Sequence, residues 1–189
     1  MARAGLTRAG LVEEAAVLVD EVGTAGLTVS ALARRVRVQP ASLYSHVTST
    51  DDLRGRVTQL ALAEMADRVA DGIAGRAGKD AVRGFADAYR GYAREHPGRY
   101  AASRLPLDAQ AAASGAGPRH AEMARAVLRG YDLTGEDQTH GVRLLGSLVH
   151  GFVDLEASGG FSHSAPPSHR SWERLVDTVD LALRAWVAA

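Results

Sequence analysis

Apolar residues recur at the three- and four-residue spacing of an α-helix along most of this chain, and this spacing limits the fold more than any other feature. The first such stretch runs from about Thr7 to Val22 and has its apolar stripe at Leu11, Ala15 and Leu18. Similar spacing recurs as far as the C-terminus, while strand-like alternation of useful length and internal repeats are absent. We therefore expect an all-α protein of about nine helices.

The composition fits a globular protein whose core is built from small and aliphatic side chains. Apolar residues make up 46% of the 189 residues and aromatic residues only 5%, so Ala, Val and Leu must form most of the core. The lack of cysteine excludes disulfides, thiol nucleophiles and cysteine-based zinc sites, and fits a reducing compartment. No apolar run approaches the roughly 20 residues of a membrane span, and acids interrupt the N-terminal apolar stretch, unlike in a secretory signal. We expect a soluble, cytoplasmic protein without a membrane partner.

The charges balance, which limits the ways in which this chain could bind nucleic acid. There are 22 basic and 22 acidic residues, so coating of nucleic acid by bulk electrostatics is disfavoured, but docking of a small patch is not. Lys79 is the one lysine, and the other basic residues are arginines. Arginine suits bidentate contacts with phosphate or guanine, although the same bias can reflect the base composition of a genome.

A helix-turn-helix is predicted near the N-terminus. A short helix after Thr28 is followed within a few residues by the segment VQPASLYSHVTSTDDL, Val38–Leu53. Pro40 suits the first turn of a helix, where its missing N–H costs nothing, and we expect the second helix over Gln39–Val47. The residues expected to pack inward in this three-helix unit are Leu18, Leu32, Val36, Leu43 and Val47.

The outward face of the second helix carries small and polar side chains that suit the major groove of DNA. Gln39 can pair with adenine, Ala41 can pack on a thymine methyl group, and Ser42 can contact either kind of base. Tyr44 and His46 can reach phosphates, which position a protein without specifying sequence. The N-terminus of the preceding helix offers amides to another phosphate. The predicted DNA-binding residues are Arg3, Arg8, Thr28, Arg37, Gln39, Pro40, Ala41, Ser42, Tyr44, Ser45, His46 and Thr50.

The segment Leu27–Leu53 resembles the DNA-binding segment of the TetR family of transcriptional regulators. It has the Leu-Thr start, the Ala-Leu-Ala core, the valine at the turn and the Leu-Tyr-x-His-Val run in order and at matching spacing. Two later segments, Phe85–Ala101 and Arg143–Phe161, resemble the C-terminal domain of one branch of that family. That branch has a tryptophan-containing helix ending in His-Gly, and here His150-Gly151 is present without a nearby preceding tryptophan.

The resemblance implies a DNA-binding domain over residues 1–50, the three-helix bundle, and a larger helical bundle over residues 51–189 that binds an effector and dimerises. In this family the last two helices pair with their symmetry mates in a four-helix interface. The apolar faces of the last two predicted helices here are more than a monomer would easily bury. The predicted dimer-interface residues are Leu145, Leu148, Val149, Phe152, Leu155, Leu175, Val176, Val179 and Leu183.

Aromatic and apolar residues of the C-terminal part can be ordinary core or can line the effector cavity that the resemblance implies, because helical bundles build ligand sites between their helices. The few fixed charges there favour a hydrophobic or aromatic effector. His150 either lines this cavity or makes a structural hydrogen bond beside glycines that let two helices approach closely. The predicted effector-binding residues are Phe85, Tyr89, Tyr92, Tyr100, Met123 and His150.

One departure from the family concerns Thr50. The family has a phosphate-binding lysine at the start of its fourth helix, whereas threonine keeps a hydroxyl but supplies no charge. The first 60 residues hold seven arginines against six acids. We expect helix dipoles, hydroxyls and a few arginines, namely Arg3, Arg8 and Arg37, to make the phosphate contacts, with a shallow salt dependence.

Neither a metal site nor catalysis is expected. His140 and His150 lie ten residues apart on one predicted helix, and no His-x-x-x-His pair occurs among the seven histidines. Ser147, His150 and Asp154 contain the groups of a catalytic triad, but on one helix they are more simply one polar stripe. We therefore expect no cofactor, no metal and no enzyme activity.

Together these features predict a ligand-responsive transcriptional regulator, a repressor that binds a palindromic operator as a homodimer. Its partners would be double-stranded DNA, a small hydrophobic or aromatic effector, and a second copy of the chain. The alternative is a small-molecule-binding or catalytic helical bundle with a degenerate helix-turn-helix, which the missing lysine at position 50 favours.

Overall fold

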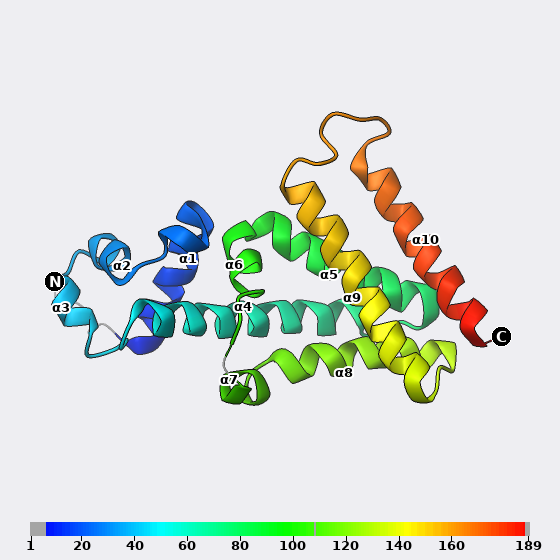
Figure 1. The fold of residues 1–189 in the computed structure, drawn as a ribbon, viewed down its shortest axis with the longest axis horizontal. Helices are drawn as coiled ribbons and strands as arrows, with labels where there is room; N and C mark the ends of the chain where they lie inside the picture. The colour runs from blue at the N-terminus through cyan, green and yellow to red at the C-terminus, as the bar shows by residue number, and fades with distance from the viewer. Residues whose placement is uncertain (1–6, 108, 188–189) are drawn as a thin grey trace. The chain divides into compact units, whose positions relative to one another are not determined.

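The computed structural model describes residues 7–107 and 109–187, and this part of the chain is built from helices (Figure 1). The described residues form ten α-helices, α1 to α10, and one short 3₁₀ helix, without a strand among them. The prediction of an all-α fold is confirmed, and the additional helix is α7, Ala109–Ser114, where three consecutive alanines favour helix. None of the helices in the described ranges is long and apolar enough to cross a membrane.

The chain divides into two compact units. The N-terminal unit comprises Met1–Glu64 and Glu95–Gly115, and the C-terminal unit comprises Met65–Arg94 and Ala116–Ala189. Helix α4, Thr50–Ile73, contributes to both units. The expected domain boundary at residue 50 coincides with the start of α4 and falls inside the N-terminal unit.

The N-terminal unit begins with two helices whose starts are set by threonine caps. Helix α1, Arg8–Gly26, follows Thr7, whose Oγ1 accepts a hydrogen bond from the Gly10 amide at 3.1 Å. Helix α2, Val29–Val36, follows Thr28, whose Oγ1 accepts from the Ala31 amide at 3.1 Å. Each bond satisfies an amide that the helix itself leaves without a partner.

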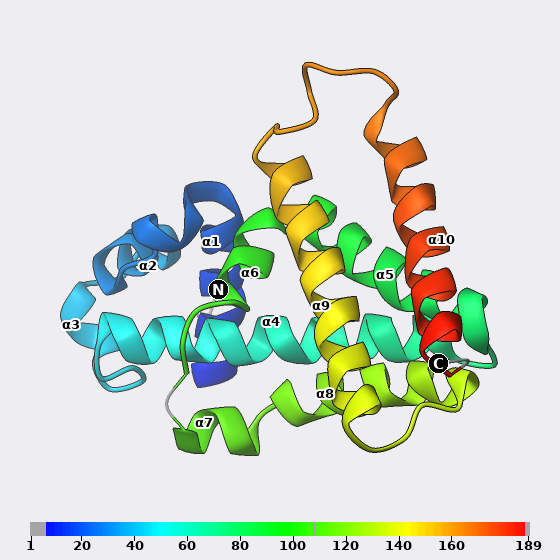
Figure 2. The same ribbon diagram turned by 45° about the vertical axis from the view of Figure 1, so that its right-hand side comes forward.

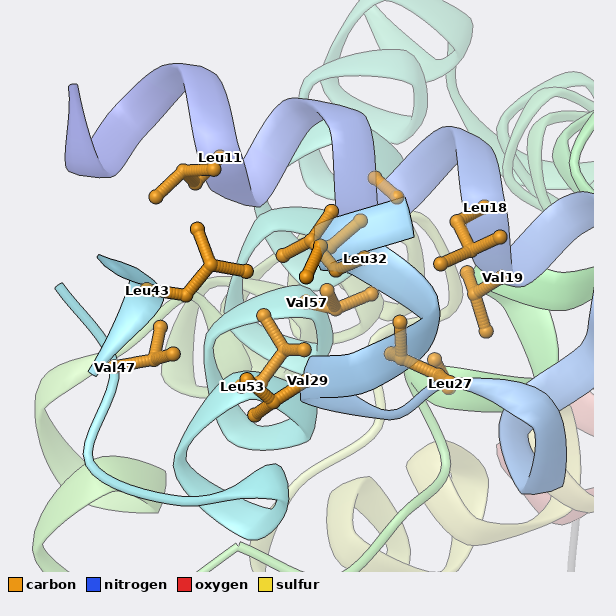
Figure 3. Close-up of a cluster of buried hydrophobic side chains, with 14 residues drawn as sticks. Leu11, Leu18, Val19, Leu27, Val29, Leu32, Leu43, Val47, Leu53 and Val57 are labelled. Carbon is orange, nitrogen blue, oxygen red and sulfur yellow. The ribbon is translucent and has the colours of Figure 1, made fainter. Parts of the chain in front are cut away.

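The first three helices and the start of α4 enclose one apolar core (Figure 3). The predicted inward residues Leu18, Leu32, Leu43 and Val47 are all buried in it, and Val36 packs against it while partly exposed. Leu43 and Val47 keep 0% and 1% of their surface, which fixes the short α3, Pro40–Leu43, to the rest of the unit. The inward face predicted from the sequence is therefore confirmed.

Helix α6, Pro97–Ala102, packs tightly against α1 within the same unit. A Cβ atom at Gly98 would lie 2.0 Å from the carbonyl oxygen of Val19, so only glycine permits this approach. The Arg99 amide donates to Asp20 Oδ1 at 2.8 Å, and the Arg99 guanidinium lies 3.0 Å from Asp20 Oδ2. Thr58 of α4 donates to the carbonyl oxygen of Ala102 at 2.9 Å. These contacts join α1, α4 and α6 in one body.

The C-terminal unit contains the end of α4 and the longest of the later helices. Its other helices are α5 (Gly78–Glu95), α8 (Gly117–Leu128), the 3₁₀ helix η1 (Arg129–Tyr131), α9 (Gly135–Ala157) and α10 (Ser168–Val187). Figures 1 and 2 both show α9 and α10 side by side, joined by the loop of residues 158–167. The apolar core of this unit includes the fully buried Tyr92, Leu145 and Trp172.

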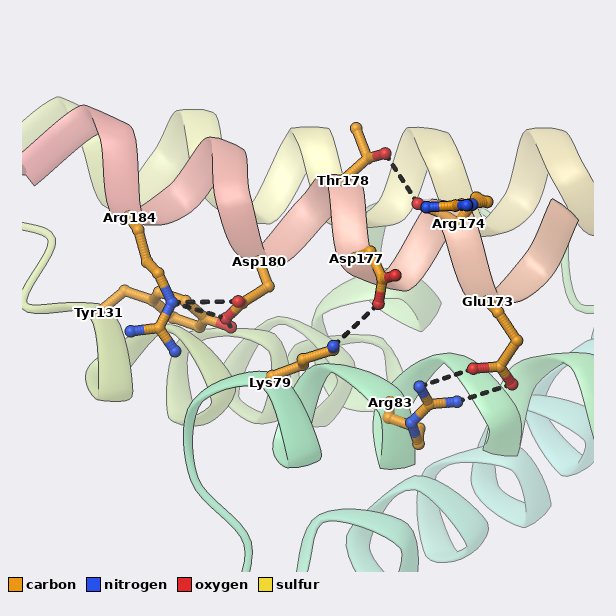
Figure 4. A network of polar contacts seen from close by, with 9 residues as sticks. All are labelled: Lys79, Arg83, Tyr131, Glu173, Arg174, Asp177, Thr178, Asp180 and Arg184. Carbon is orange, nitrogen blue, oxygen red and sulfur yellow. Dashed lines mark hydrogen bonds and ion pairs between the residues drawn. The ribbon is translucent and has the colours of Figure 1, made fainter. Parts of the chain in front are cut away.

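Polar contacts tie α10 to α5 and η1 (Figure 4). Lys79 pairs with Asp177 at 2.9 Å, and Arg83 pairs with Glu173 at 2.8 Å. The Tyr131 hydroxyl donates to Asp180 Oδ1 at 2.7 Å. Burial first, and then the bond to this carboxylate, raise the pKa of Tyr131. The α10 helix is therefore held along its length by polar groups as well as by its apolar face.

Candidate nucleic-acid interface

The turn between α2 and α3 is made by the backbone around Arg37. This residue has φ of 57° and ψ of 46°, the left-handed conformation. Its amide donates to the Arg34 carbonyl at 3.3 Å, and the Val38 amide donates to the Ala33 carbonyl at 3.0 Å. These two bonds form a Schellman motif, in which glycine is the usual left-handed residue. An arginine here bears a steric cost of about 1–2 kcal/mol, which makes it a candidate for function.

The second helix of the motif is shorter than the predicted Gln39–Val47. It is α-helical over Pro40–Leu43, with Pro40 at its first position, and continues as a turn through His46. The His46 amide donates to the Leu43 carbonyl at 2.8 Å, a three-residue spacing that tightens the chain beyond an α-helix. Ser45 Oγ also donates to the Ser42 carbonyl at 3.0 Å and occupies an acceptor there.

The predicted DNA-contacting residues lie mainly on the surface of this motif. Tyr44 keeps 56% of its surface exposed, which is unusual for a large aromatic side chain and leaves its ring and hydroxyl available. Thr28, His46 and Thr50 are half-buried. Arg3 lies outside the described residues. The exposed members of the set are Arg8, Arg37, Gln39, Pro40, Ala41, Ser42, Tyr44 and Ser45.

Acidic residues neutralise some arginines of the N-terminal unit and leave others available. Arg35 bonds Glu14 and Glu21, both at 2.8 Å, and these bonds raise the pKa of Arg35. By contrast, Arg8, Arg34 and Arg37 are exposed and make no ion pair with any residue in the described ranges. Arg34 is an addition to the predicted set, because its sequence neighbour Arg35 has the same chemistry and only the structure distinguishes them.

The start of α4 has little free positive charge. Arg56 pairs with Asp52 at 2.8 Å, and Arg54 lies 3.6 Å from Asp51. Desolvation alone would raise the pKa of Asp52, but hydrogen bonds from the Thr48 amide and from Arg56 outweigh it and lower the pKa. Thr50, at the first position of α4, therefore offers a hydroxyl and a helix N-terminus rather than a charge.

Three of the predicted effector-binding residues meet in the C-terminal unit. The Tyr89 ring lies 4.8 Å from that of Phe85 and meets the His150 ring edge-on at 5.1 Å, both measured between centroids. Tyr89 also shares a hydrogen bond of 2.6 Å with Nδ1 of His120. The sequence pattern does not indicate His120, because its partner lies on another helix.

The other predicted effector-binding residues are more dispersed. Tyr92 is buried beneath the guanidinium of Arg68, 5.4 Å from its ring centroid, and Met123 is half-buried on α8. Tyr100 lies on α6 in the N-terminal unit and so belongs to a different compact unit from the remaining five.

A groove of about 1070 Å³, here named the α1–α4 groove, lies within the N-terminal unit. Sequence reasoning does not predict it, because its lining comes from three segments that are far apart in the chain. The lining residues are Arg8, Ala9, Val12, Glu13, Asp51, Asp52, Gly55, Arg56, Gln59, Leu60, Pro106, Leu107 and Ala111.

The predicted dimer-interface residues divide into two groups. Five of them are fully buried within the single chain, at 0% exposure: Leu145, Val149, Val176, Val179 and Leu183. Because they have no surface to offer a partner, their predicted place in a dimer interface is corrected to the core of the C-terminal unit. Leu148, Phe152 and Leu175 are half-buried, and Leu155 is 53% exposed. Leu181 of α10, 67% exposed, is an addition that the sequence pattern does not distinguish.

The described ranges contain no group of three or more His, Asp or Glu side chains that could hold a metal ion. Ser147, His150 and Asp154 all lie on α9, as the sequence pattern predicts.

Several known proteins resemble this chain in sequence and in fold. A family model described as the tetracyclin repressor-like C-terminal domain matches residues 82–179. An uncharacterised HTH-type transcriptional regulator of Mycobacterium tuberculosis, Rv0681, is 40% identical over 164 residues, which cover 82% of this chain and 72% of that protein. The crystal structure of apo ActR from Streptomyces coelicolor is similar over 100% of both chains, with a TM-score of 0.74 and 25% identity. A TetR variant from Acinetobacter baumannii in complex with minocycline shares the fold, with a TM-score of 0.62, 20% identity and coverage of 97% of this chain and 95% of that one.

Proposed function

We propose that this chain, which belongs to the TetR family of transcriptional regulators, represses transcription by binding a palindromic operator through α2, α3 and the turn between them, and releases DNA when a small molecule binds. The observation that carries the proposal is the division of the 39–47 segment into two faces. Leu43 and Val47 are buried, whereas Gln39, Ser42 and Tyr44 are exposed.

The base contacts follow from the chemistry of the exposed face. Gln39 at the helix start can donate and accept with adenine, and Ala41 and Ser42 are small enough to let the backbone approach the base edges. Because the α-helical part has only four residues, few base pairs per half-site are contacted directly. We therefore propose that Gln39, Ala41 and Ser42 determine sequence preference.

The phosphate contacts come from groups around that helix. Arg37 and Tyr44 are both exposed on the same motif, and Arg8 and Arg34 add charge without an acidic partner among the described residues. The capped N-terminus of α2 adds backbone amides. Such contacts supply affinity and fix orientation but carry no sequence information.

A homodimer is proposed from the apolar surface that remains on α9 and α10. Leu155 and Leu181 are more than half exposed, and Leu148, Phe152 and Leu175 keep part of their surface. A twofold pair of these helices would bury that surface. It would also present two α3 helices to successive major grooves, about 34–36 Å apart or somewhat more.

The effector is proposed to bind in the C-terminal unit around Tyr89. Phe85 and Tyr89 supply aromatic surface, and the imidazoles of His120 and His150 lie against the same ring. A hydrophobic or aromatic molecule with one polar group suits such a set. The complex of the A. baumannii protein with minocycline supports a small-molecule site in this fold. The effector would act only by its different affinity for the DNA-competent and released states.

The experiment that tests the proposal is binding of the purified chain to the DNA upstream of its own coding region. The Tyr44→Ala and Tyr44→Phe variants should both bind this DNA about ten-fold more weakly, because each protomer loses a phosphate hydrogen bond. Both should keep the wild-type unfolding midpoint by circular dichroism, since Tyr44 is largely exposed. Unchanged DNA affinity in Tyr44→Ala would show that this face is not the interface.

A further inference from the structure

We propose that the α1–α4 groove is a second small-molecule site, and that it takes an organic cation with an apolar body. This site lies in the N-terminal unit, whereas the proposed effector site lies in the C-terminal unit. Its existence does not depend on whether the chain binds DNA.

The first support is the size and apolar lining of the groove. Its volume of about 1070 Å³ lies just above the range of about 300–1000 Å³ that is typical of small-molecule pockets. Val12 and Leu60 form part of its wall, keep part of their surface exposed, and pack against the core that holds α2 and α3. An apolar body that covers them would remove exposed hydrocarbon from water.

The second support is the charge of the lining. Glu13, Asp51 and Asp52 outnumber Arg8 and Arg56, so the lining has a net negative charge. Asp52 is paired with Arg56 and bonded to the Thr48 amide, so that both charges are already satisfied. The charges that remain to meet a ligand come mainly from Glu13, Asp51 and Arg8.

Glu13 is the carboxylate best suited to hold a cation. It is exposed on α1 and makes neither an ion pair nor a hydrogen bond with any side chain in the part of the chain that the structure describes. Asp51 is less suited, because it lies 3.6 Å from Arg54 and also faces the positive end of α4. An organic cation could place its ammonium group against the Glu13 carboxylate and its hydrocarbon against Val12 and Leu60. It would then match both the charge and the apolar surface of the groove.

The same groove contains a proposed phosphate contact. Arg8 lines it and has no acidic partner among the described residues. A bound cation would repel Arg8 and compete for the space through which Arg8 reaches a phosphate. Occupancy of the groove should therefore weaken DNA binding, a consequence that rests on the proposed function, whereas ligand binding itself does not.

Isothermal titration calorimetry with three probes tests the site. The probes have similar hydrocarbon tails and differ in the charge of the head group: n-octylammonium, n-octanol and n-octanoate. We expect octylammonium to bind wild type more tightly than octanol, and octanoate to bind most weakly. The Glu13→Gln variant should bind octylammonium about five-fold more weakly, the effect of an exposed ion pair, and should bind octanol as wild type does. Glu122→Gln, which changes an exposed carboxylate on α8, is the matched control.

A second variant tests the location without changing charge. Gly55 lines the groove, and a Cβ atom there would meet nothing within 4 Å, so Gly55→Leu should fold and fill the groove. Gly91→Leu is its control, because Gly91 on α5 is equally open. We expect octylammonium binding to be lost in Gly55→Leu and kept in Gly91→Leu. Equal binding to both variants, or octanoate binding as tight as octylammonium binding, would overturn the proposal.

Discussion

The α-carbon of Gly98 faces the carbonyl oxygen of Val19 so closely that a Cβ atom would lie 2.0 Å from it. This contact holds α6 against α1 in the N-terminal unit, and both partners are constrained because a backbone carbonyl cannot move aside as a flexible side chain can. Gly98→Ala should therefore lower the free energy of unfolding by about 1–3 kcal/mol.

Urea unfolding followed by circular dichroism measures this effect, and Gly91→Ala is its control. Gly91 lies inside α5, and a Cβ atom there would meet nothing within 4 Å, so alanine should raise the free energy of unfolding by about 0.5–1 kcal/mol. Equal effects of the two substitutions would contradict a close α1–α6 contact at Gly98.

A substitution at Arg37 should affect the stability of the fold and the affinity for DNA in different ways. Because Arg37 occupies the left-handed position of a Schellman motif, Arg37→Gly should leave the free energy of unfolding unchanged or raise it by up to about 1 kcal/mol. The same change removes an exposed guanidinium, so affinity for DNA should fall and the salt dependence should become shallower. Thermal unfolding and DNA titration at several salt concentrations measure the two effects; loss of stability in Arg37→Gly would contradict this explanation of the turn.

Thr50 should limit the electrostatic part of DNA binding. Within the described N-terminal residues, Arg8, Arg34 and Arg37 are the exposed arginines without an acidic partner, which gives six in the proposed dimer. The slope of the logarithm of the DNA-binding constant against the logarithm of salt concentration should therefore be about −5, and Thr50→Lys should steepen it to about −7 with a gain in affinity at low salt. Thr139→Lys places the same charge on an exposed position of α9 and should change the slope little. A wild-type slope already steeper than about −7 would show that other cations contact the phosphates.

The Arg90–Glu156 pair predicts a pH dependence of stability. The two side chains lie 2.6 Å apart with only 11% and 16% of their surface exposed. The hydrogen bond from Arg90, aided by Ser168, lowers the pKa of Glu156 from 4.5 to about 2. A carboxyl whose pKa falls on folding adds stability above its unfolded pKa, and this stability is lost as the pH falls from 4.5 toward 2.

Glu156→Gln should therefore lower the free energy of unfolding at pH 7 by about 1–2 kcal/mol, after allowance for solvent screening. The difference between wild type and variant should shrink as the pH falls from 5 to about 2. Glu173→Gln alters a more exposed pair with Arg83 and should have a smaller effect. A difference for Glu156→Gln that is constant over this range would show that its charge does not stabilise the fold.

The N-terminal unit could be predicted from sequence because hydrogen bonds between nearby residues and the spacing of apolar residues define its helices. Thr7 and Thr28 cap helices through bonds to residues three positions along, and the spacing of Leu43 and Val47 is enough to assign the inward face. The end of the second helix was less predictable, because Ser45 and the His46 amide take up carbonyl oxygens in a tighter turn. The spacing of apolar residues does not indicate which groups bond these carbonyl oxygens, so it could not predict where the helix ends.

Features formed by distant segments could not be predicted in the same way. The α1–α4 groove combines Val12, Leu60 and Leu107, and the Tyr89–His120 bond joins two helices. The apolar pattern of α9 and α10 indicates burial but not whether the partner is the same chain or another. Leu145 and Val179 are buried within the chain, whereas Leu155 and Leu181 are not, and this distinction requires the tertiary structure.

In the proposed function the exposed face of α3 determines which DNA is bound, and Gln39→Ala tests this role most directly. Fluorescence anisotropy would compare affinity for the upstream DNA with affinity for a scrambled duplex of equal length and composition, for wild type, Gln39→Ala and the α9 control Gln138→Ala. We predict that wild type and Gln138→Ala prefer the upstream DNA, and that Gln39→Ala loses about ten-fold of this preference while its affinity for the scrambled duplex stays the same. An equal preference in Gln39→Ala and wild type, or no preference in wild type, would contradict this claim.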